Sequence, residues 1–158
     1  MAKYCLGYAF DEAYRYVVLL QKQWPEELKN NWTGVGGRVE ENESYLSAMV
    51  REFYEETGVE SDVNDWKFLA DVYCHRGGDS RYFPDEAGLI GCYYTNKLDI
   101  EQARTVTDEP VEVYPVDRVL AHDFKMTRLT PLLVGLACNH EQHSWKILTR
   151  AHPDAEIF

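Results

Sequence analysis

The chain has 158 residues, which is the length of one ordinary domain and is enough to bury a substantial core. Apolar residues make up 45% and charged residues 27%, so the composition argues against a disordered, collagen-like or coiled-coil protein. Twenty-seven acidic residues against 16 basic ones give a net charge of −11, which disfavours duplex nucleic acid and anionic membranes as partners. No apolar run approaches the ~18 to 20 residues of a membrane span.

The beginning of the chain and its cysteines indicate a cytoplasmic protein. Strand-like sequence begins at Tyr4, with no charged leader, long apolar stretch and cleavage site before it. The four cysteines are far apart in sequence, and three of them have apolar neighbours: Cys5, Cys74, Cys92 and Cys138. We therefore expect reduced, buried thiols instead of a disulfide framework or a zinc site.

The first forty residues contain two strand-like segments and a glycine-rich segment. Residues 4–10 and 16–23 are rich in aromatic and β-branched residues with a short polar stretch between them, which predicts a β-hairpin. Trp24-Pro25 ends the second strand. Further on, three glycines in four residues allow the backbone to approach another group closely: Gly34, Gly36 and Gly37.

A central helix is predicted after the glycines. Ser44 is a suitable N-cap, the helix runs to about Thr57, and Gly58 supplies its C-terminal stop. Apolar residues follow at helical spacing and give the helix one face for the core: Leu46, Met49, Val50 and Phe53.

The second half predicts three more strands and one more helix. Residues 66–75, 89–96 and 111–116 read as strands, and 76–88 as a long surface loop. Residues 128–139 read as a helix whose first turn accommodates Pro131. The tail, with Trp145 and Ile147, is expected to pack back on the body. The whole chain, 1–158, is therefore predicted to be a single mixed α/β domain.

Three glutamates on the central helix form the most informative feature. Glu52, Glu55 and Glu56 share one helix face, set apart from the apolar stripe, and like charges at i, i+4 are unfavourable. A hard dication such as Mg²⁺ or Mn²⁺ reverses that repulsion, because these ions prefer oxygen ligands. A backbone carbonyl near Gly37 can add a neutral ligand, and Arg51 can orient a carboxylate. For three glutamates alone, a solvated helix face is the simpler interpretation.

Spacing over a longer stretch overturns that interpretation. Gly37 is followed after five residues by Glu43 and, after seven more, by Arg51-Glu52-Phe53-Tyr54-Glu55-Glu56-Thr57-Gly58-Val59. This pattern resembles the Nudix box of the Nudix hydrolases at every fixed position. The one departure is Phe53, where the family usually has an aliphatic residue; because Phe53 is apolar and on the core face, we expect altered packing and unaltered chemistry.

The resemblance implies a fold and roles for the box residues. The fold is an α/β/α sandwich with a mixed β-sheet, in which the box forms a loop-helix-loop. Glu55 and Glu56 are the implied principal metal ligands, Glu52 is a ligand or the base that activates water, and Glu43 and Arg51 support the site by salt bridging.

Family members often have one further glutamate, before a late strand, that approaches the metals. Glu112 is the best match in this chain and Glu109 the second. For Glu112, an outward-facing strand residue is an equally good interpretation.

Other segments suggest substrate contacts more weakly. Trp24 and Trp32 flank the loop that enters the box and can stack on a nucleobase, although either can simply anchor a loop. Arg38 follows the box glycine and is a third substrate-binding candidate. Arg76 and Arg81 add cations to the long loop, and a solvated loop is the simpler interpretation of them.

A short histidine pattern near the C-terminus does not match a zinc-protease site. His140-Glu141-Gln142-His143 lacks the histidine that the zinc-protease spacing requires at 144, where Ser144 stands.

The family cleaves a nucleoside diphosphate linked to a further moiety, using a divalent metal, so the expected partner is a small nucleotide. Markers of the ADP-ribose and NADH subclasses are absent; the first proline beyond the box is Pro84. The chain is thus most similar to the MutT-like enzymes that convert a (d)NTP to a (d)NMP and pyrophosphate. Hydrolysis of ADP-ribose or a dinucleoside polyphosphate, a catalytically silent nucleotide-sensing module, and homodimer formation remain open.

Overall fold

The computed structural model describes residues 1–75, 88–139 and 145–150. Its strands are β1 (Ala2–Ala9), β2 (Tyr16–Gln21), β3 (Trp32–Thr33), β4 (Lys67–His75), β5 (Gly88–Thr95), β6 (Val111–Pro115) and β7 (Trp145–Arg150). Its α-helices are α1 (Tyr45–Thr57), α2 (Val116–Leu120) and α3 (Leu129–Cys138). Three short 3₁₀ helices lie at Glu26–Leu28, Val63–Asp65 and Ile100–Gln102.

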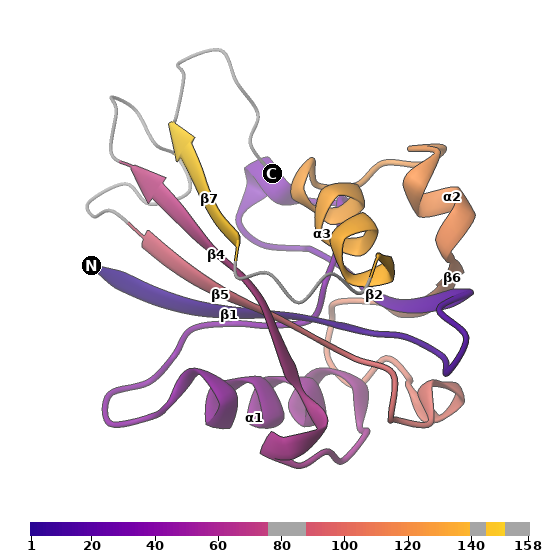
Figure 1. The fold of residues 1–158 in the computed structure, drawn as a ribbon, viewed down its shortest axis with the longest axis horizontal. Helices are drawn as coiled ribbons and strands as arrows, with labels where there is room; N and C mark the ends of the chain where they lie inside the picture. The colour runs from indigo at the N-terminus through magenta and orange to yellow at the C-terminus, as the bar shows by residue number, and fades with distance from the viewer. Residues whose placement is uncertain (76–87, 140–144, 151–158) are drawn as a thin grey trace.

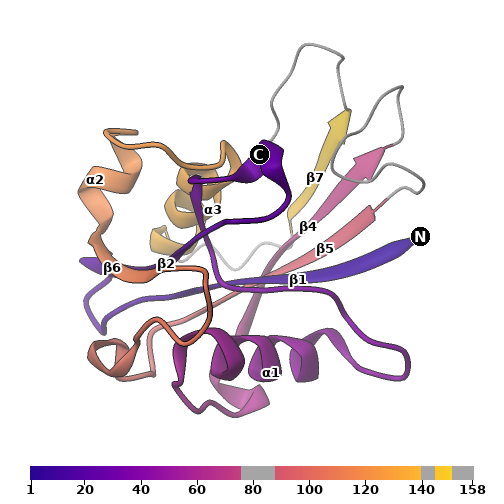
Figure 2. The ribbon, with the colours of Figure 1, turned by 180° about the vertical axis from the view of Figure 1, so that it is seen from behind.

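The strands form two sheets between helical layers. One sheet has the order β1-β5-β4-β7 and is mixed, because β1 is parallel to β5, β5 antiparallel to β4, and β4 parallel to β7. The other is antiparallel, with the order β3-β2-β6. Opposite views show α1 below the strands and α2 and α3 above them (Figures 1 and 2). The predicted α/β/α sandwich with a mixed sheet is confirmed.

The predicted hairpin of the first two strands is wrong. β1 and β2 share only one bridge, between Phe10 and Val17, and then diverge into different sheets. β1 instead pairs along its whole length with β5, far away in sequence. Short sequence separation favours a hairpin, but the parallel pairing with β5 places β1 at the edge of the mixed sheet, between the layers of α1 and α3.

The central helix matches its prediction closely. The Ser44 side chain accepts a hydrogen bond from the Ser47 N–H, and Gly58 ends the helix at a φ of 74°, a conformation that favours glycine. Met49 and Phe53 are fully buried, while Leu46 and Val50 are partly buried at the margin of the core. The apolar stripe therefore fixes which face of α1 packs on the strands and turns the acidic face toward the sheet edge.

The other elements bear out most predictions, and three elements were not predicted as such. β4, β5, β6 and α3 lie where strands and a helix were expected, and the tail adds β7, parallel to β4. The short strand β3 and the five-residue helix α2 were not anticipated. Residues 76–87 and 140–144, which include both loop arginines and the histidine pattern, lie outside the described residues.

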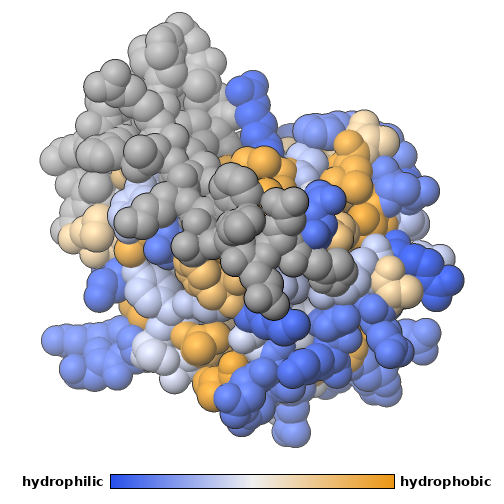
Figure 3. Space-filling model, in the orientation of Figure 1, coloured by the Kyte–Doolittle hydropathy of each residue, from blue (hydrophilic) through white to orange (hydrophobic). Residues whose placement is uncertain are grey.

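The core is divided by the strands into two clusters. The cluster on the α1 side includes Ala9, Leu20, Met49 and Phe53, and the cluster on the α3 side includes Tyr8, Leu19, Leu133 and Val134. Successive residues of β1 and of β2 alternate between the two clusters, as the period of a strand requires. The surface over α1, at the bottom of Figure 3, is mainly hydrophilic, in keeping with the negative charge of the chain.

Two further features concern the cysteines and the helices. All four cysteines are free thiols; three are buried and Cys138 is partly exposed. Within the described ranges, no helix has the length and apolar character needed to cross a membrane.

The position of Phe53 gives a stability prediction. Its fully buried ring meets that of Trp66 edge-on, with 5.1 Å between centroids. Phe53→Ala should lower the free energy of unfolding by ~3 to 5 kcal/mol through a core cavity, and Phe53→Leu by less than about 1.5 kcal/mol, as measured by urea denaturation. Phe68→Ala, at a ring that is 44% exposed, is the control. An alanine variant of Phe53 that keeps its stability and loses only activity would contradict the core role.

Candidate active site

A glycine-containing segment beside β1 organises the site. Alternate residues of this segment hydrogen-bond to β1 in an antiparallel pattern: Gly7 N–H to the Val35 carbonyl (2.7 Å), Val35 N–H to the Gly7 carbonyl (3.0 Å), Cys5 N–H to the Gly37 carbonyl (2.9 Å) and Val39 N–H to the Lys3 carbonyl (2.9 Å). Residues 35, 37 and 39 therefore direct their backbone groups at β1. The intervening residues direct theirs away from it.

Those intervening residues contact the acidic face of α1. The Gly36 N–H donates to Glu56 Oε2 (3.2 Å), and the Arg38 carbonyl accepts from Arg51 Nη2 (3.0 Å). In a regular extended segment the N–H and C=O of one residue point to the same side, so we expect the Gly36 carbonyl to face the carboxylates as well.

The Gly37 carbonyl, predicted as a metal ligand, has other partners. It accepts the Cys5 N–H and the Cys5 thiol (3.6 Å), so it points at β1. Burial raises the pKa of the Cys5 thiol to about 12, so the sulfur stays protonated as a donor. The alternation of the segment, which the sequence alone does not reveal, therefore directs the Gly37 carbonyl at β1.

Gly37 has a different role in this arrangement. A Cβ atom built on it would lie 2.5 Å from the Glu52 carboxylate. Only glycine therefore allows Glu52 to lie against the backbone of this segment.

Arg51 is the cation that holds the acidic groups together. Its guanidinium binds Glu43 through two hydrogen bonds of 2.9 Å, Glu52 through one of 2.7 Å and Glu55 through one of 3.3 Å. The bonds from Arg51 lower the pKa of Glu43 and, in turn, raise that of Arg51. The predicted supporting role of Glu43 and Arg51 thus has a geometric basis: a planar fork that also reaches the Arg38 carbonyl.

Glu56 is buried in an unfavourable electrostatic environment. Its side chain is 8% exposed, and its pKa is raised to about 8, first by burial and then by the charges of Glu109 and Glu52, although Lys22 opposes the shift. Burial also raises the pKa of Glu52, against the opposing effect of Arg51. Carboxylates with raised pKa values in one place are typical of a functional site.

The structure brings Glu109, and not Glu112, to this group of acids. Glu109 is 8% exposed and accepts hydrogen bonds from Lys22 Nζ and the Gln23 N–H, both at 2.9 Å. Glu112 is exposed and pairs in register with Leu19, so its side chain lies on the sheet face opposite α1. The preference for Glu112 is therefore corrected in favour of Glu109, the second candidate.

Lys22 was missed at the sequence level. It is joined to Glu109 by an ion pair that is largely shielded from solvent, and its charge also acts on Glu56. Nothing in the local sequence after β2 indicates a role for Lys22, because Glu56 and Glu109 are both remote from it in sequence.

The donor set suits a hard divalent cation. Carboxylates such as Glu56 and Glu52, whose pKa values are raised, provide the oxygen ligands that Mg²⁺ and Mn²⁺ prefer. In the part of the chain that the structure describes, no three acidic, histidine or cysteine side chains are grouped so as to hold a metal ion as they stand. Glu52 and Glu55 each give one carboxylate oxygen to Arg51 in this arrangement.

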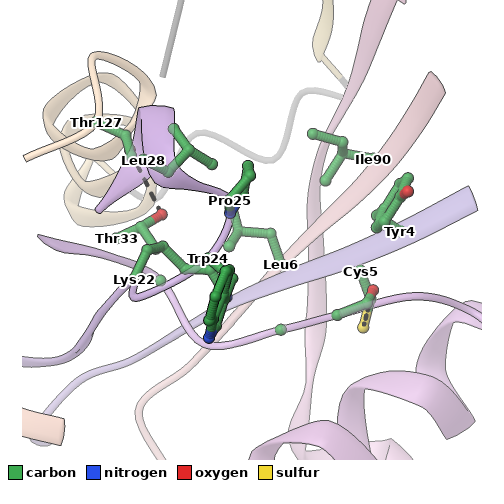
Figure 4. A pocket seen from close by; sticks show the side chains of 13 residues that line it. Tyr4, Cys5, Leu6, Lys22, Trp24, Pro25, Leu28, Thr33, Ile90 and Thr127 are labelled. Atoms are coloured by element: carbon green, nitrogen blue, oxygen red, sulfur yellow. Dashed lines mark hydrogen bonds between the residues drawn. The ribbon is translucent and has the colours of Figure 1, made fainter. Parts of the chain in front are cut away.

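A cavity of about 290 Å³ adjoins these acids (Figure 4). It shares Gly36, Gly37 and Lys22 with the site and lies on the α3 side of the strands. Its walls are mainly apolar and are formed by Tyr4, Leu6, Trp24, Pro25, Leu28 and Ile90. An ammonium group and two hydroxyl groups also line it, from Lys22, Thr33 and Thr127. Its volume is close to the lower end of the range of small-molecule sites, about 300 Å³.

Of the three residues predicted to contact the substrate, only Trp24 lines the cavity. Trp24 lines the cavity with its ring 68% exposed, so one face is open for stacking. Trp32 is buried and packs edge-on against Tyr114, with 4.9 Å between centroids, so it is a core anchor and its predicted stacking role is corrected. The Arg38 side chain is exposed and does not line the cavity; its carbonyl serves Arg51.

With this geometry described, comparison with known proteins identifies the family. A family model of the NUDIX domain matches residues 5–133. The chain belongs to the Nudix family. With its complete Nudix box, it is a Nudix-type pyrophosphohydrolase. A search of curated proteins finds no match.

Solved structures with the same Nudix fold come from bacterial MutT proteins. The mutator MutT protein from Bacillus halodurans superposes with a TM-score of 0.74 at 18% identity, covering 98% of this chain and 92% of that one. A MutT NUDIX hydrolase from Burkholderia pseudomallei gives 0.68 at 18% identity, covering 85% and 96%. A MutT structure from a study of Aliivibrio salmonicida and Vibrio cholerae gives 0.65 at 16% identity, covering 89% and 98%. At such identities the likeness establishes the fold.

The buried Glu56 predicts a pH-dependent stability of the metal-free protein. Its pKa is about 8 when folded against 4.5 for an ordinary glutamate, so the folded state favours the protonated form. The stabilisation is fully present below pH 4.5 and is lost as the pH rises through 8. We expect the wild type to lose unfolding free energy relative to Glu56→Gln between pH 5 and 8, in urea titrations with a chelator.

The control for this pH series is Glu60→Gln, which changes an exposed carboxyl beyond the end of α1. It should follow the wild type at every pH. If the difference between wild type and Glu56→Gln is independent of pH, Glu56 ionises normally and the electrostatic description of the site is wrong.

Proposed function

We propose that this Nudix protein is a metal-dependent hydrolase that converts nucleoside triphosphates to nucleoside monophosphates and pyrophosphate. The observation that carries the proposal is the shared edge at Gly36 and Gly37, where the acids of the box meet a largely apolar cavity. A nucleotide has matching parts: an apolar, stackable base and an anionic phosphate chain. Placing the base in the cavity brings the phosphates to the acids, which cannot accept them without added positive charge.

The residues that would hold the cation are Glu52, Glu55 and Glu56, with the Gly36 carbonyl and Glu109. When bound, a divalent cation neutralises the diphosphate and lowers the pKa of a water molecule. Arg51 keeps Glu43 and the helix face in place, because its fork also binds the neighbouring Arg38 carbonyl. A box carboxylate, Glu52 in our assignment, then removes the proton from the attacking water.

Lys22 is well placed to act on the phosphates. It lines the cavity and is paired with Glu109, so its ammonium group lies between the base cavity and the acids. An anionic phosphate chain that enters from the cavity meets this cation before it meets the carboxylates. Trp24, at the edge of the cavity, is our candidate for stacking on the base.

The reaction products test the proposed substrate. Incubation with Mg²⁺ and a panel of nucleotides, resolved by ion-exchange chromatography, should give monophosphate and pyrophosphate in equal amounts from a triphosphate. Release of orthophosphate and a diphosphate would contradict the proposal. If triphosphates are inert and ADP-ribose yields AMP and ribose phosphate, the preferred substrate is wrong. If every nucleotide binds and none is cleaved, the chain is a nucleotide-sensing module.

Substitution of Glu56 tests the site. Glu56→Gln preserves volume and removes the charge, so we expect turnover to fall by ~10² to 10⁴, measured at saturating Mg²⁺. Glu60→Gln should leave turnover unchanged, since its exposed side chain lies outside the site. Near-normal turnover in the Glu56 variant would exclude a principal role for this carboxylate.

Metal binding has a separate readout in stability. Mg²⁺ or Mn²⁺ should raise the melting temperature, because a cation bound only by the folded state stabilises it by about 2.7 kcal/mol at a hundredfold excess over Kd. Scanning calorimetry with and without millimolar metal measures this shift, and Glu56→Gln should reduce it. No shift, with or without a nucleotide, would count against the metal site.

A further inference from the structure

A short loop before β6 carries Glu109 to the acids of α1, where its charge acts on the box. At the start of the loop the Arg104 N–H donates to the Thr57 carbonyl (3.0 Å), at the end of α1. At its other end the Pro110 carbonyl accepts from the Gln21 N–H (2.8 Å), at the end of β2. The loop is thus fixed at one end to the helix of the box and at the other to the antiparallel sheet.

Side-chain packing contributes little to holding this loop. Residues 104–108 are all exposed, whereas Glu109 is 8% exposed. An exposed segment with few buried apolar contacts moves readily unless its backbone is hydrogen-bonded. The position of Glu109 therefore depends on the hydrogen bonds that its carboxylate and its backbone make.

Two donors from the segment after β2 hold the Glu109 carboxylate. Lys22 Nζ donates to Oε2 and the Gln23 N–H donates to Oε1, both at 2.9 Å. Each carboxylate oxygen has two lone pairs, so these two bonds leave one lone pair on each oxygen for a cation. Glu109 can therefore be held in place and still act as a ligand.

The backbone of Glu109 is held from both sides. On its C-terminal side, Pro110 confines Glu109 to an extended backbone, because the proline ring clashes with the helical conformation of the residue before it. On its N-terminal side, the Glu109 N–H donates to Thr107 Oγ1 (3.1 Å). A second threonine, Thr105, accepts the Val111 N–H (2.9 Å) and so closes the loop around Glu109.

We infer that Thr107 is a positioning residue whose hydroxyl fixes the backbone at Glu109 and thereby sets the affinity of the acids for a divalent cation. This inference rests on the metal site of the proposed function. Without the Thr107 oxygen, the N-terminal side of Glu109 loses its restraint, and the carboxylate is held beside Glu56 less firmly. Groups that orient a metal ligand without touching the metal change metal affinity by about 10- to 100-fold.

Binding of Mn²⁺ tests the inference without catalysis. Titration of the purified protein with Mn²⁺, followed by the electron paramagnetic resonance signal of the free ion, gives the Kd. Thr107→Val keeps the shape of the side chain and removes its oxygen, so the Kd should rise by about 10-fold. Thr107→Ser retains the hydroxyl and should bind Mn²⁺ as the wild type does.

Thr95 provides the matched control. Its Oγ1 accepts the Lys97 N–H (3.2 Å), which is the same hydrogen bond between residues i and i+2, but it lies at the end of β5 instead of in the loop that carries Glu109. Thr95→Val should therefore leave the Kd for Mn²⁺ unchanged. An equal rise of the Kd in the Thr95 and Thr107 variants would mean a general loss of structure and would overturn the inference.

A second background separates positioning of Glu109 from any other effect of Thr107. In Glu109→Gln the carboxylate is already absent, so adding Thr107→Val should raise the Kd for Mn²⁺ no further. An added rise in that background, or a folded Thr107→Val with the Kd of the wild type, contradicts the inference and leaves the hydrolase intact. A wild type that binds no Mn²⁺ contradicts both. If Mn²⁺ binding depends on Thr107 as expected but no triphosphate is cleaved, the proposed function fails and the inference stands.

Discussion

The antiparallel pairing of residues 35–39 with β1 is the constraint on which the site depends. Backbone groups of residues 35, 37 and 39 hydrogen-bond to β1. The Gly36 N–H and the Arg38 carbonyl instead point toward α1, where they bind Glu56 and Arg51. These two contacts tie Glu56 and Arg51 to the segment, whereas the apolar face of α1 packs on the strands. The pairing therefore helps to fix the positions of the carboxylates on the acidic face of α1.

Local signals were sufficient to predict the helix that bears the acids. An N-cap, an apolar stripe and a glycine stop all act within a few residues, and α1 begins and ends where they place it. The resemblance to the Nudix box likewise implied that Glu43 and Arg51 support the site by salt bridging, and the structure joins them. The short helix α2 was not predicted, because its five residues are too few to show a helical periodicity.

What the sequence could not provide is pairing between remote segments. A run such as residues 111–116 shows which side chains alternate, but only its partner decides which face is buried, and register with β2 turned Glu112 away from α1. Lys22 and Glu109, 87 residues apart, meet only because β2 and β6 are neighbours. For the same reason Trp32 could be recognised as an anchor only once Tyr114 was known to lie against it.

The burial of Glu56 between Glu109 and Glu52 has a consequence for the cation binding that we propose. Near neutral pH much of the population holds a proton on this carboxyl, and a cation that binds there must displace it. Uptake is then an exchange, in which the medium receives a proton for each cation bound to a protonated site. The apparent heat of cation binding therefore depends on the ionisation enthalpy of the buffer. Lowering the pH and lowering the cation concentration both reduce the fraction of protein that holds the cation.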